Sequence, residues 1–148
     1  MSCTQAQHSN YTLIMAKVEL TYLIDDDAIV LLLGRKVFAR HDKFGELQTF
    51  ENGGSALDTI TAQAGTGTGL PSLILLDLNM PGMDGWEFLE QFKRIPETAH
   101  IPVVILTSSI DPQDIAKSKT FDNVKDYIPK PLTTEKLDQI LASAKPND

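Results

Sequence analysis

The middle of the chain reads Leu73-Ile74-Leu75-Leu76-Asp77-Leu78-Asn79-Met80-Pro81-Gly82-Met83-Asp84-Gly85. Its first four residues are apolar, which is typical of a strand buried on both faces, since a half-exposed strand alternates apolar and polar residues. The proline and glycines after Asp77 favour a turn, so the strand ends at the aspartate. The pattern therefore predicts a carboxylate at the carboxyl end of a central parallel strand, where open α/β sheets bind ligands.

Strand-like and helix-like segments alternate along the rest of the chain. Strands are predicted at 18–24, 46–50, 73–76, 103–106 and 124–128, the second of them weaker and so expected at an edge. A helix is expected after each strand: the second opening at Ser55, the third carrying Phe88, Leu89 and Phe92 on one face, and the last capped by Thr133 or Thr134. Five strands alternating with five helices predict a doubly wound parallel sheet with helices on both faces.

Two of these helices carry further expectations. The first is expected to bury its apolar residues at helical spacing, which are Ile29, Leu32, Leu33, Val37 and Phe38. The fourth, at 113–120, is weakly amphipathic, and we expect it to be the least firmly held element. Asn123 is suited to a left-handed turn at the end of this helix.

Polar residues follow four of the predicted strands. Asp25-Asp26-Asp27 follows the first strand, Asp77 the third, Thr107 the fourth and Lys130 the fifth. If the central three strands are neighbours, these side chains meet at one rim of the sheet, because the carboxyl ends of parallel strands share an edge. Asp27 is assigned to capping the following helix.

This set of residues predicts a specific chemistry. Clustered carboxylates need a positive partner, and an all-oxygen ligand set without His or Cys favours a hard cation such as Mg²⁺. Lys130 and the Thr107 hydroxyl are suited to bind phosphoryl oxygens, and Asp77 is suited to attack phosphorus. We therefore expect a site that accepts a phosphoryl group on Asp77, although each residue taken alone fits an ordinary structural role.

Composition limits the class of protein. The chain has 148 residues, a net charge of −7 and one cysteine, Cys3. This acidity argues against binding nucleic acid, and no apolar run reaches the roughly eighteen residues that span a bilayer. The single cysteine excludes an internal disulfide and fits a reducing compartment, so a cytoplasmic location is expected.

Four motifs carry a family resemblance. They are Leu23-Ile24-Asp25-Asp26-Asp27, the loop from Asp77 to Gly85, Leu106-Thr107-Ser108, and Tyr127-Ile128-Pro129-Lys130-Pro131. With them the chain resembles, from Lys17 to Ala144, the receiver domains of two-component response regulators. The resemblance implies a flavodoxin-like five-stranded sheet in the order 2-1-3-4-5 with five helices.

The same resemblance implies roles for the residues of the rim. Asp77 is implied as the phosphoacceptor, and Asp25, Asp26 and Asp77 as Mg²⁺ ligands together with the backbone carbonyl of Asn79. The catalytic set implied is Asp77, Lys130 and Thr107, and the switch residues implied are Thr107 and Tyr127. A cis Lys130–Pro131 peptide bond is also implied.

These observations lead to one functional prediction and two alternatives. We expect a flexible leader at 1–16, a receiver domain at 17–145 and a tail at 146–148. This single-domain response regulator, not an enzyme in the ordinary sense, would take its phosphoryl group from a phosphohistidine on a sensor histidine kinase or histidine phosphotransfer protein. It would signal to a downstream protein through a switched surface of the fourth helix, fifth strand and fifth helix. The alternatives are a receiver-like interaction module that is never phosphorylated and a haloacid-dehalogenase-like phosphatase, which would want an aspartate where Asn79 stands.

Overall fold

A five-stranded parallel sheet forms the centre of the molecule. The structure is a computed structural model that describes residues 18–144, so the predicted leader and tail lie outside the described residues. The strands lie in the order β2-β1-β3-β4-β5, with every neighbouring pair parallel. Their bounds are β1 Val18–Ile24, β2 Phe44–Phe50, β3 Leu73–Leu76, β4 Val103–Thr107 and β5 Val124–Pro129. The predicted flavodoxin-like fold and strand order are confirmed, and the weak second strand is at an edge.

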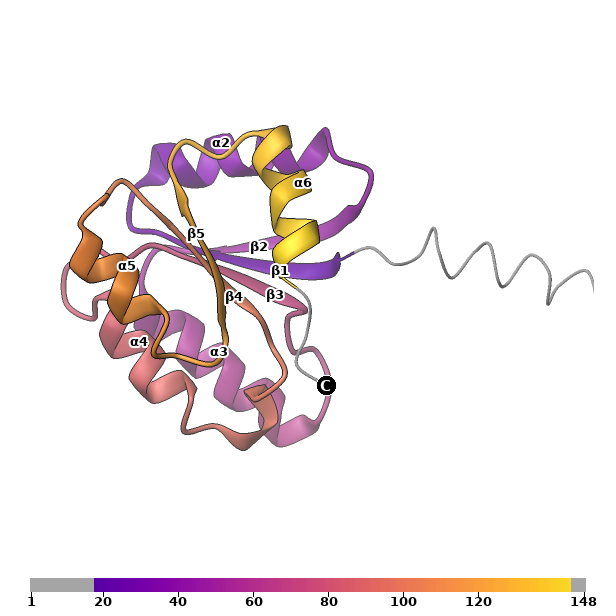
Figure 1. Cartoon of the computed structure of the whole chain (residues 1–148). Coiled ribbons are helices and arrows are strands. Elements are labelled where there is room, and N and C mark those ends of the chain that lie inside the picture. The colour runs from indigo at the N-terminus through magenta and orange to yellow at the C-terminus, as the bar shows by residue number, and fades with distance from the viewer. Residues whose placement is uncertain (1–17, 145–148) are drawn as a thin grey trace, which may run out of the picture.

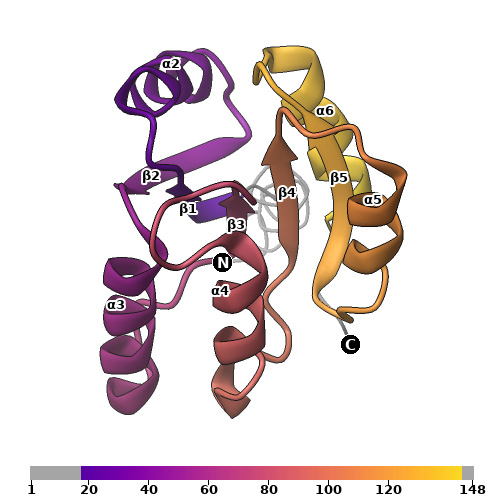
Figure 2. The same cartoon turned by 90° about the vertical axis from the view of Figure 1, so that its left-hand side faces the viewer.

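Helices cover both faces of this sheet. Figures 1 and 2 show α2 and α6 on one face and α3, α4 and α5 on the other. Their bounds are α2 Ala28–Ala39, α3 Gly53–Thr66, α4 Gly85–Phe92, α5 Pro112–Ser118 and α6 Thr134–Ser143, with a 3-10 turn η1 at Pro96–Thr98. Each face has its own apolar cluster, and β3 and β4, buried throughout, separate the two. The four consecutive apolar residues of β3 are expected for a strand that is buried on both faces.

Polar side chains fix where the helices begin. Asp27 accepts a hydrogen bond from the Ile29 N–H at 2.9 Å, which confirms its predicted capping role. Thr133, rather than Thr134, caps α6 by accepting from the Lys136 N–H. α3 begins two residues before the predicted Ser55, because Asn52 provides its cap.

None of the helices within 18–144 is long and apolar enough to cross a membrane.

The predicted buried face of α2 is wrong in part. Ile29, Leu32 and Leu33 are 66%, 49% and 48% exposed, and the helix instead buries Leu31, Gly34 and Phe38. Apolar residues are continuous from 28 to 33, so spacing alone does not fix which side of the helix faces the sheet. Gly34 does fix it, because a Cβ built there would lie 2.5 Å from Leu23 Cδ2. The helix therefore packs closest to the sheet at a glycine.

The predicted left-handed turn at Asn123 is also wrong, since no residue other than glycine has a positive φ in the described chain. The Asn123 side chain instead donates hydrogen bonds to the carbonyls of Thr98, Ala99 and Ile101, at 3.1, 3.3 and 2.8 Å. Asparagine here ties the turn before β5 to the loop before β4.

The pairing of β4 with β5 contains one irregularity. Val103 pairs with Val124 and Val104 pairs with Asp126, so Lys125 is an extra residue on β5. After it, Asp126 faces α6, where it accepts a hydrogen bond from the Ser143 hydroxyl at 2.8 Å. Tyr127 faces the α5 side of the sheet.

Candidate functional site

The acidic residues meet at the carboxyl ends of β1 and β3. These strands are neighbours in the sheet, and Ile24 pairs with Leu76, so the residues that follow, Asp25 and Asp77, lie side by side. Asp25 is 1% exposed and Asp77 4% exposed, whereas Asp26 faces solvent. One carboxylate oxygen from each of the three lies within 4.8 Å of the others. The predicted convergence of these acids is thus present.

Lys130 brings a positive charge into this cluster from the end of β5. Its Nζ lies 2.7 Å from Asp25 Oδ2 and 3.4 Å from Asp77 Oδ1. The Lys130 N–H donates to the Thr107 carbonyl at 2.9 Å, which holds the lysine backbone against the end of β4. Asp25 Oδ1 accepts a hydrogen bond from the Asp27 N–H at 2.9 Å, whereas, among the described residues, the buried Asp25 Oδ2 is compensated by the ion pair with Lys130 alone.

The electrostatics of the pair follow from burial and charge. Burial raises the pKa of Asp77 above its ordinary value, and the neighbouring Asp25 carboxylate raises it further; Lys130 and the Asn79 N–H oppose this shift without cancelling it. Burial alone would lower the pKa of Lys130, but its hydrogen bond to Asp25 and the charges of Asp77 and Asp25 raise it overall. Two carboxylates thus face one protonated ammonium, so the site has more negative than positive charge.

Thr107 and Tyr127 lie on the next two strands. Thr107 is buried, and its hydroxyl oxygen accepts a hydrogen bond from the Ser109 N–H at 3.3 Å. Tyr127 is half-buried, and its hydroxyl donates to the Ser109 carbonyl at 2.9 Å. The peptide bond between Lys130 and Pro131 is cis, as the resemblance implied. Sequence reasoning missed Ser109, because a small polar residue in a loop carries no periodic signal.

The residues present fit a hard divalent cation. The donors are carboxylate oxygens from three side chains in one small region, and the single Lys130 ammonium does not balance their charge. Mg²⁺ binds such oxygen ligands and retains several waters, which suits a cluster with one solvent-exposed member, Asp26. The contribution of the Asn79 backbone carbonyl stays a prediction.

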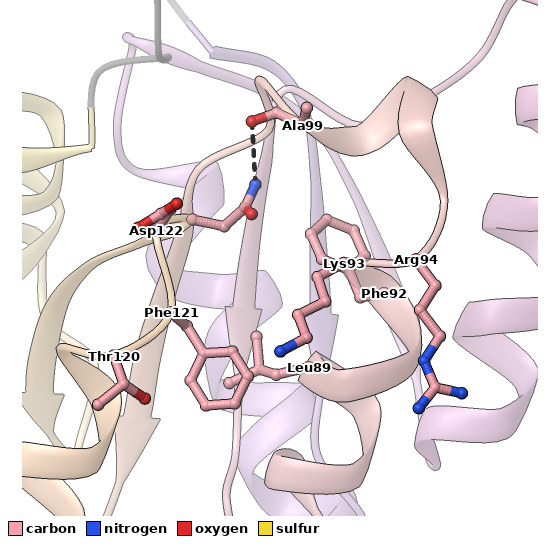
Figure 3. A pocket seen from close by; sticks show the side chains of 9 residues that line it. Leu89, Phe92, Lys93, Arg94, Ala99, Thr120, Phe121 and Asp122 are labelled. Carbon is pink, nitrogen blue, oxygen red and sulfur yellow. Dashed lines mark hydrogen bonds between the residues drawn. The ribbon is translucent and has the colours of Figure 1, made fainter.

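A cavity lies at the end of the sheet opposite to the acidic cluster. It has a volume of about 510 Å³ and is located where α4 ends and the chain turns into β5 (Figure 3). Phe92, Leu89 and Phe121 supply apolar surface, and the Lys93 ammonium lies 5.3 Å from the centre of the Phe121 ring. None of the predicted site residues lines this cavity.

Comparison with known proteins agrees with the fold and the cluster. The sequence profile of the response regulator receiver domain matches residues 21–142. The probable methanogenesis regulatory protein FilR2 of Methanothrix harundinacea is 34% identical over 123 residues, which cover 83% of this chain and 79% of FilR2. The response regulator PleD of Caulobacter vibrioides is 36% identical over 111 residues, and there the match spans 22% of the relative's length.

Solved structures give the same answer. A two-component response regulator from Cytophaga hutchinsonii superposes with a TM-score of 0.78 at 35% identity, covering 85% of this chain and 96% of that one. The Mn²⁺-bound form of response regulator Rcp1 superposes with a TM-score of 0.67 at 30% identity, covering 83% and 88% of the two chains. The chain belongs to the response regulator receiver domain family of two-component signalling. Members of this family are in general phosphorylated on an aspartate by histidine kinases or phosphotransfer proteins, with Mg²⁺ at an acidic pocket.

Proposed function

We propose that this chain accepts a phosphoryl group on Asp77 from a phosphohistidine of a sensor kinase or phosphotransfer protein. The observation that carries the proposal is the cluster itself: Asp77 lies within 4.8 Å of Asp25 and Asp26, measured between carboxylate oxygens, with the Lys130 ammonium 3.4 Å from Asp77 Oδ1. Membership of the receiver family supports it.

The step proposed is a single phosphoryl transfer. An Asp77 carboxylate oxygen forms a bond to phosphorus while the bond from phosphorus to the donor imidazole nitrogen breaks. The electron pair of the broken bond stays on that nitrogen, so the imidazole leaves neutral or takes up a proton from solvent. Lys130 and the Thr107 hydroxyl stabilise the phosphoryl oxygens as charge redistributes among them.

Asp25, Asp26 and Asp77, with the Asn79 carbonyl, would hold Mg²⁺. When bound, the ion supplies positive charge that offsets both the carboxylates and the incoming phosphoryl group. The Mn²⁺-bound relative Rcp1 and the oxygen-only donor set support this assignment. The protein acts as a phosphoacceptor that assists its own modification rather than as an enzyme that turns over a substrate.

The signal would leave through the surface formed by α5, β5 and α6, which corresponds to the fourth helix, fifth strand and fifth helix of the sequence prediction. Tyr127 lies on β5 and its hydroxyl contacts the loop that follows Thr107, so a change at Thr107 reaches this surface through one residue. A cytoplasmic location and the absence of a nucleic-acid partner stay predictions.

Acetyl phosphate with Mg²⁺ tests the proposal. A labelled acyl phosphate is expected on wild type, with none on Asp77→Asn and none after chelation of the metal. Labelling that persists in Asp77→Asn would contradict it. Magnesium binding without any covalent adduct would favour an unphosphorylated interaction module, and turnover of a phosphate ester would favour a phosphatase.

A further inference from the structure

Ser109 uses every polar group that it has. Its N–H donates to the Thr107 hydroxyl oxygen at 3.3 Å, and its carbonyl accepts from the Tyr127 hydroxyl at 2.9 Å. Its own hydroxyl donates to Asp114 Oδ2 at 2.8 Å and accepts from the Asp111 N–H at 3.3 Å. One residue therefore contacts both predicted switch residues with its backbone and the first turn of α5 with its side chain.

The helix that Ser109 contacts is weakly anchored by apolar packing. α5 has seven residues, of which only Ser118 is buried, and Ile115 is half-buried. A short helix with so little apolar contact depends on the polar contacts at its ends for its position. At its start these are the hydrogen bonds to Ser109.

At its other end α5 contacts the neighbouring helix through an aromatic ring. The Lys117 ammonium lies 4.8 Å from the centre of the Trp86 ring on α4. Trp86 in turn stacks on Phe121, with ring centroids 6.0 Å apart and planes at 19°. Trp86 is the only tryptophan in the chain, so its fluorescence reports the placement of α5 against α4.

We propose that Ser109 is a positioning residue that couples the state of Thr107 and Tyr127 to the position of α5. This inference rests on the proposed function. The hydrogen bond from the Ser109 N–H to the Thr107 hydroxyl oxygen is long. A phosphoryl oxygen that accepts a hydrogen bond from the Thr107 hydroxyl, and so moves it, therefore breaks this contact easily. Because the Ser109 hydroxyl is hydrogen-bonded to Asp114, a displacement of Ser109 also moves the first turn of α5.

The experiment uses the full chain with beryllofluoride and Mg²⁺ as the phosphoryl mimic. Binding of the mimic is followed by fluorine NMR, and the position of α5 by Trp86 emission. Ser109→Ala keeps both backbone contacts and removes only the hydroxyl. Ser109→Thr restores a hydroxyl, Asp114→Ala removes its acceptor, and Gln113→Ala, an exposed position in the same turn, is the matched control.

Wild type and the Gln113→Ala control are expected to bind the mimic and to change Trp86 emission. Ser109→Ala and Asp114→Ala should still bind it, with an emission change reduced at least about two-fold, the size typical of a lost coupling contact. The double variant should lose no more than either single variant, and Ser109→Thr should recover the response.

Two results would overturn the inference. One is a full Trp86 response in Ser109→Ala or Asp114→Ala with the mimic bound, and the other is bound mimic in wild type without any Trp86 response. Failure of wild type to bind the mimic is a different outcome, because it removes the proposed function and the inference with it.

Discussion

Lys130 lies closer to Asp25 than to Asp77, with its Nζ 2.7 Å from Asp25 Oδ2 and 3.4 Å from Asp77 Oδ1. The ammonium therefore neutralises the more buried acid and only partly compensates the proposed phosphoacceptor. This arrangement leaves the site with a net negative charge. We therefore expect that binding a metal ion, or removing one carboxylate, stabilises the fold.

Replacing Lys130 with methionine should lower the free energy of unfolding by about 3 kcal/mol, because removal of one member of a buried ion pair leaves the other charge uncompensated. The loss should be smaller with Mg²⁺ present, since the metal then supplies the missing charge. Urea unfolding with and without Mg²⁺ measures both values. Lys119→Met, at an exposed position, is the control, and an equal loss in the two conditions would contradict the metal assignment.

Asp77→Asn should raise the free energy of unfolding in metal-free buffer by roughly 1 kcal/mol, a size ordinary for a single substitution. It removes one of two buried carboxylates that repel each other, as the raised pKa of Asp77 indicates. Urea unfolding at neutral pH is the measurement, and Asp58→Asn on the exposed face of α3 is the control. A destabilised Asp77→Asn variant would mean that Lys130 compensates both acids fully.

Truncation should destabilise the protein on the buried side of α2 and have little effect on its exposed side. Leu31→Ala should cost about 3 kcal/mol of unfolding free energy, because Leu31 is 4% exposed and its removal leaves a cavity. Leu32→Ala should change it by less than about 0.5 kcal/mol, since Leu32 is half exposed. Denaturant unfolding of the two variants measures both values. A larger loss of unfolding free energy in Leu32→Ala than in Leu31→Ala would support the helix orientation expected from spacing.

Substitutions at Asn123 distinguish a backbone role from a side-chain role. Asn123→Gly should lower the free energy of unfolding by about 2 kcal/mol, because three carbonyls lose the amide that donates to them. Glycine would instead be neutral or favourable if the position needed a left-handed backbone. Thermal or urea unfolding of Asn123→Gly distinguishes the side-chain role from the backbone role. Asp122→Ala, at the exposed neighbouring position, is the control.

Tyr22 should make the protein sensitive to alkaline pH. Burial raises the pKa of Tyr22 above 10.0, and the charge of Glu46 adds to this effect. The stabilising contribution of the neutral phenol is complete below the unfolded pKa and is lost as pH rises through the folded value. The free energy of unfolding should therefore fall less steeply above about pH 10 in Tyr22→Phe than in wild type. Equal slopes for the two proteins would contradict this.

The sheet and the acidic cluster were predictable because the signals behind them are local. Four apolar residues ending in Asp77 indicate a buried strand, and parallel strands bring Asp25 and Asp77 to one edge whatever the loops do. The orientation of α2 was not predictable from periodicity, because Ile29 to Leu33 is apolar throughout and the close contact of Gly34 with Leu23 is visible only in three dimensions. Ser109 was missed because its contacts with Thr107 and Asp114 follow no period, and its contact with Tyr127 joins residues 18 apart in the sequence.

The extra residue at Lys125 has a consequence for how this strand can change during evolution. Val103 pairs with Val124 and Val104 with Asp126, so without Lys125 consecutive residues of β4 would pair with consecutive residues of β5, and Asp126 and Tyr127 would keep their faces. A deletion between Tyr127 and Lys130 would instead turn Tyr127 toward α6 and away from Ser109, because side chains alternate faces along a strand. The number of residues between Tyr127 and Lys130 is thus more tightly constrained than the number between Val124 and Asp126.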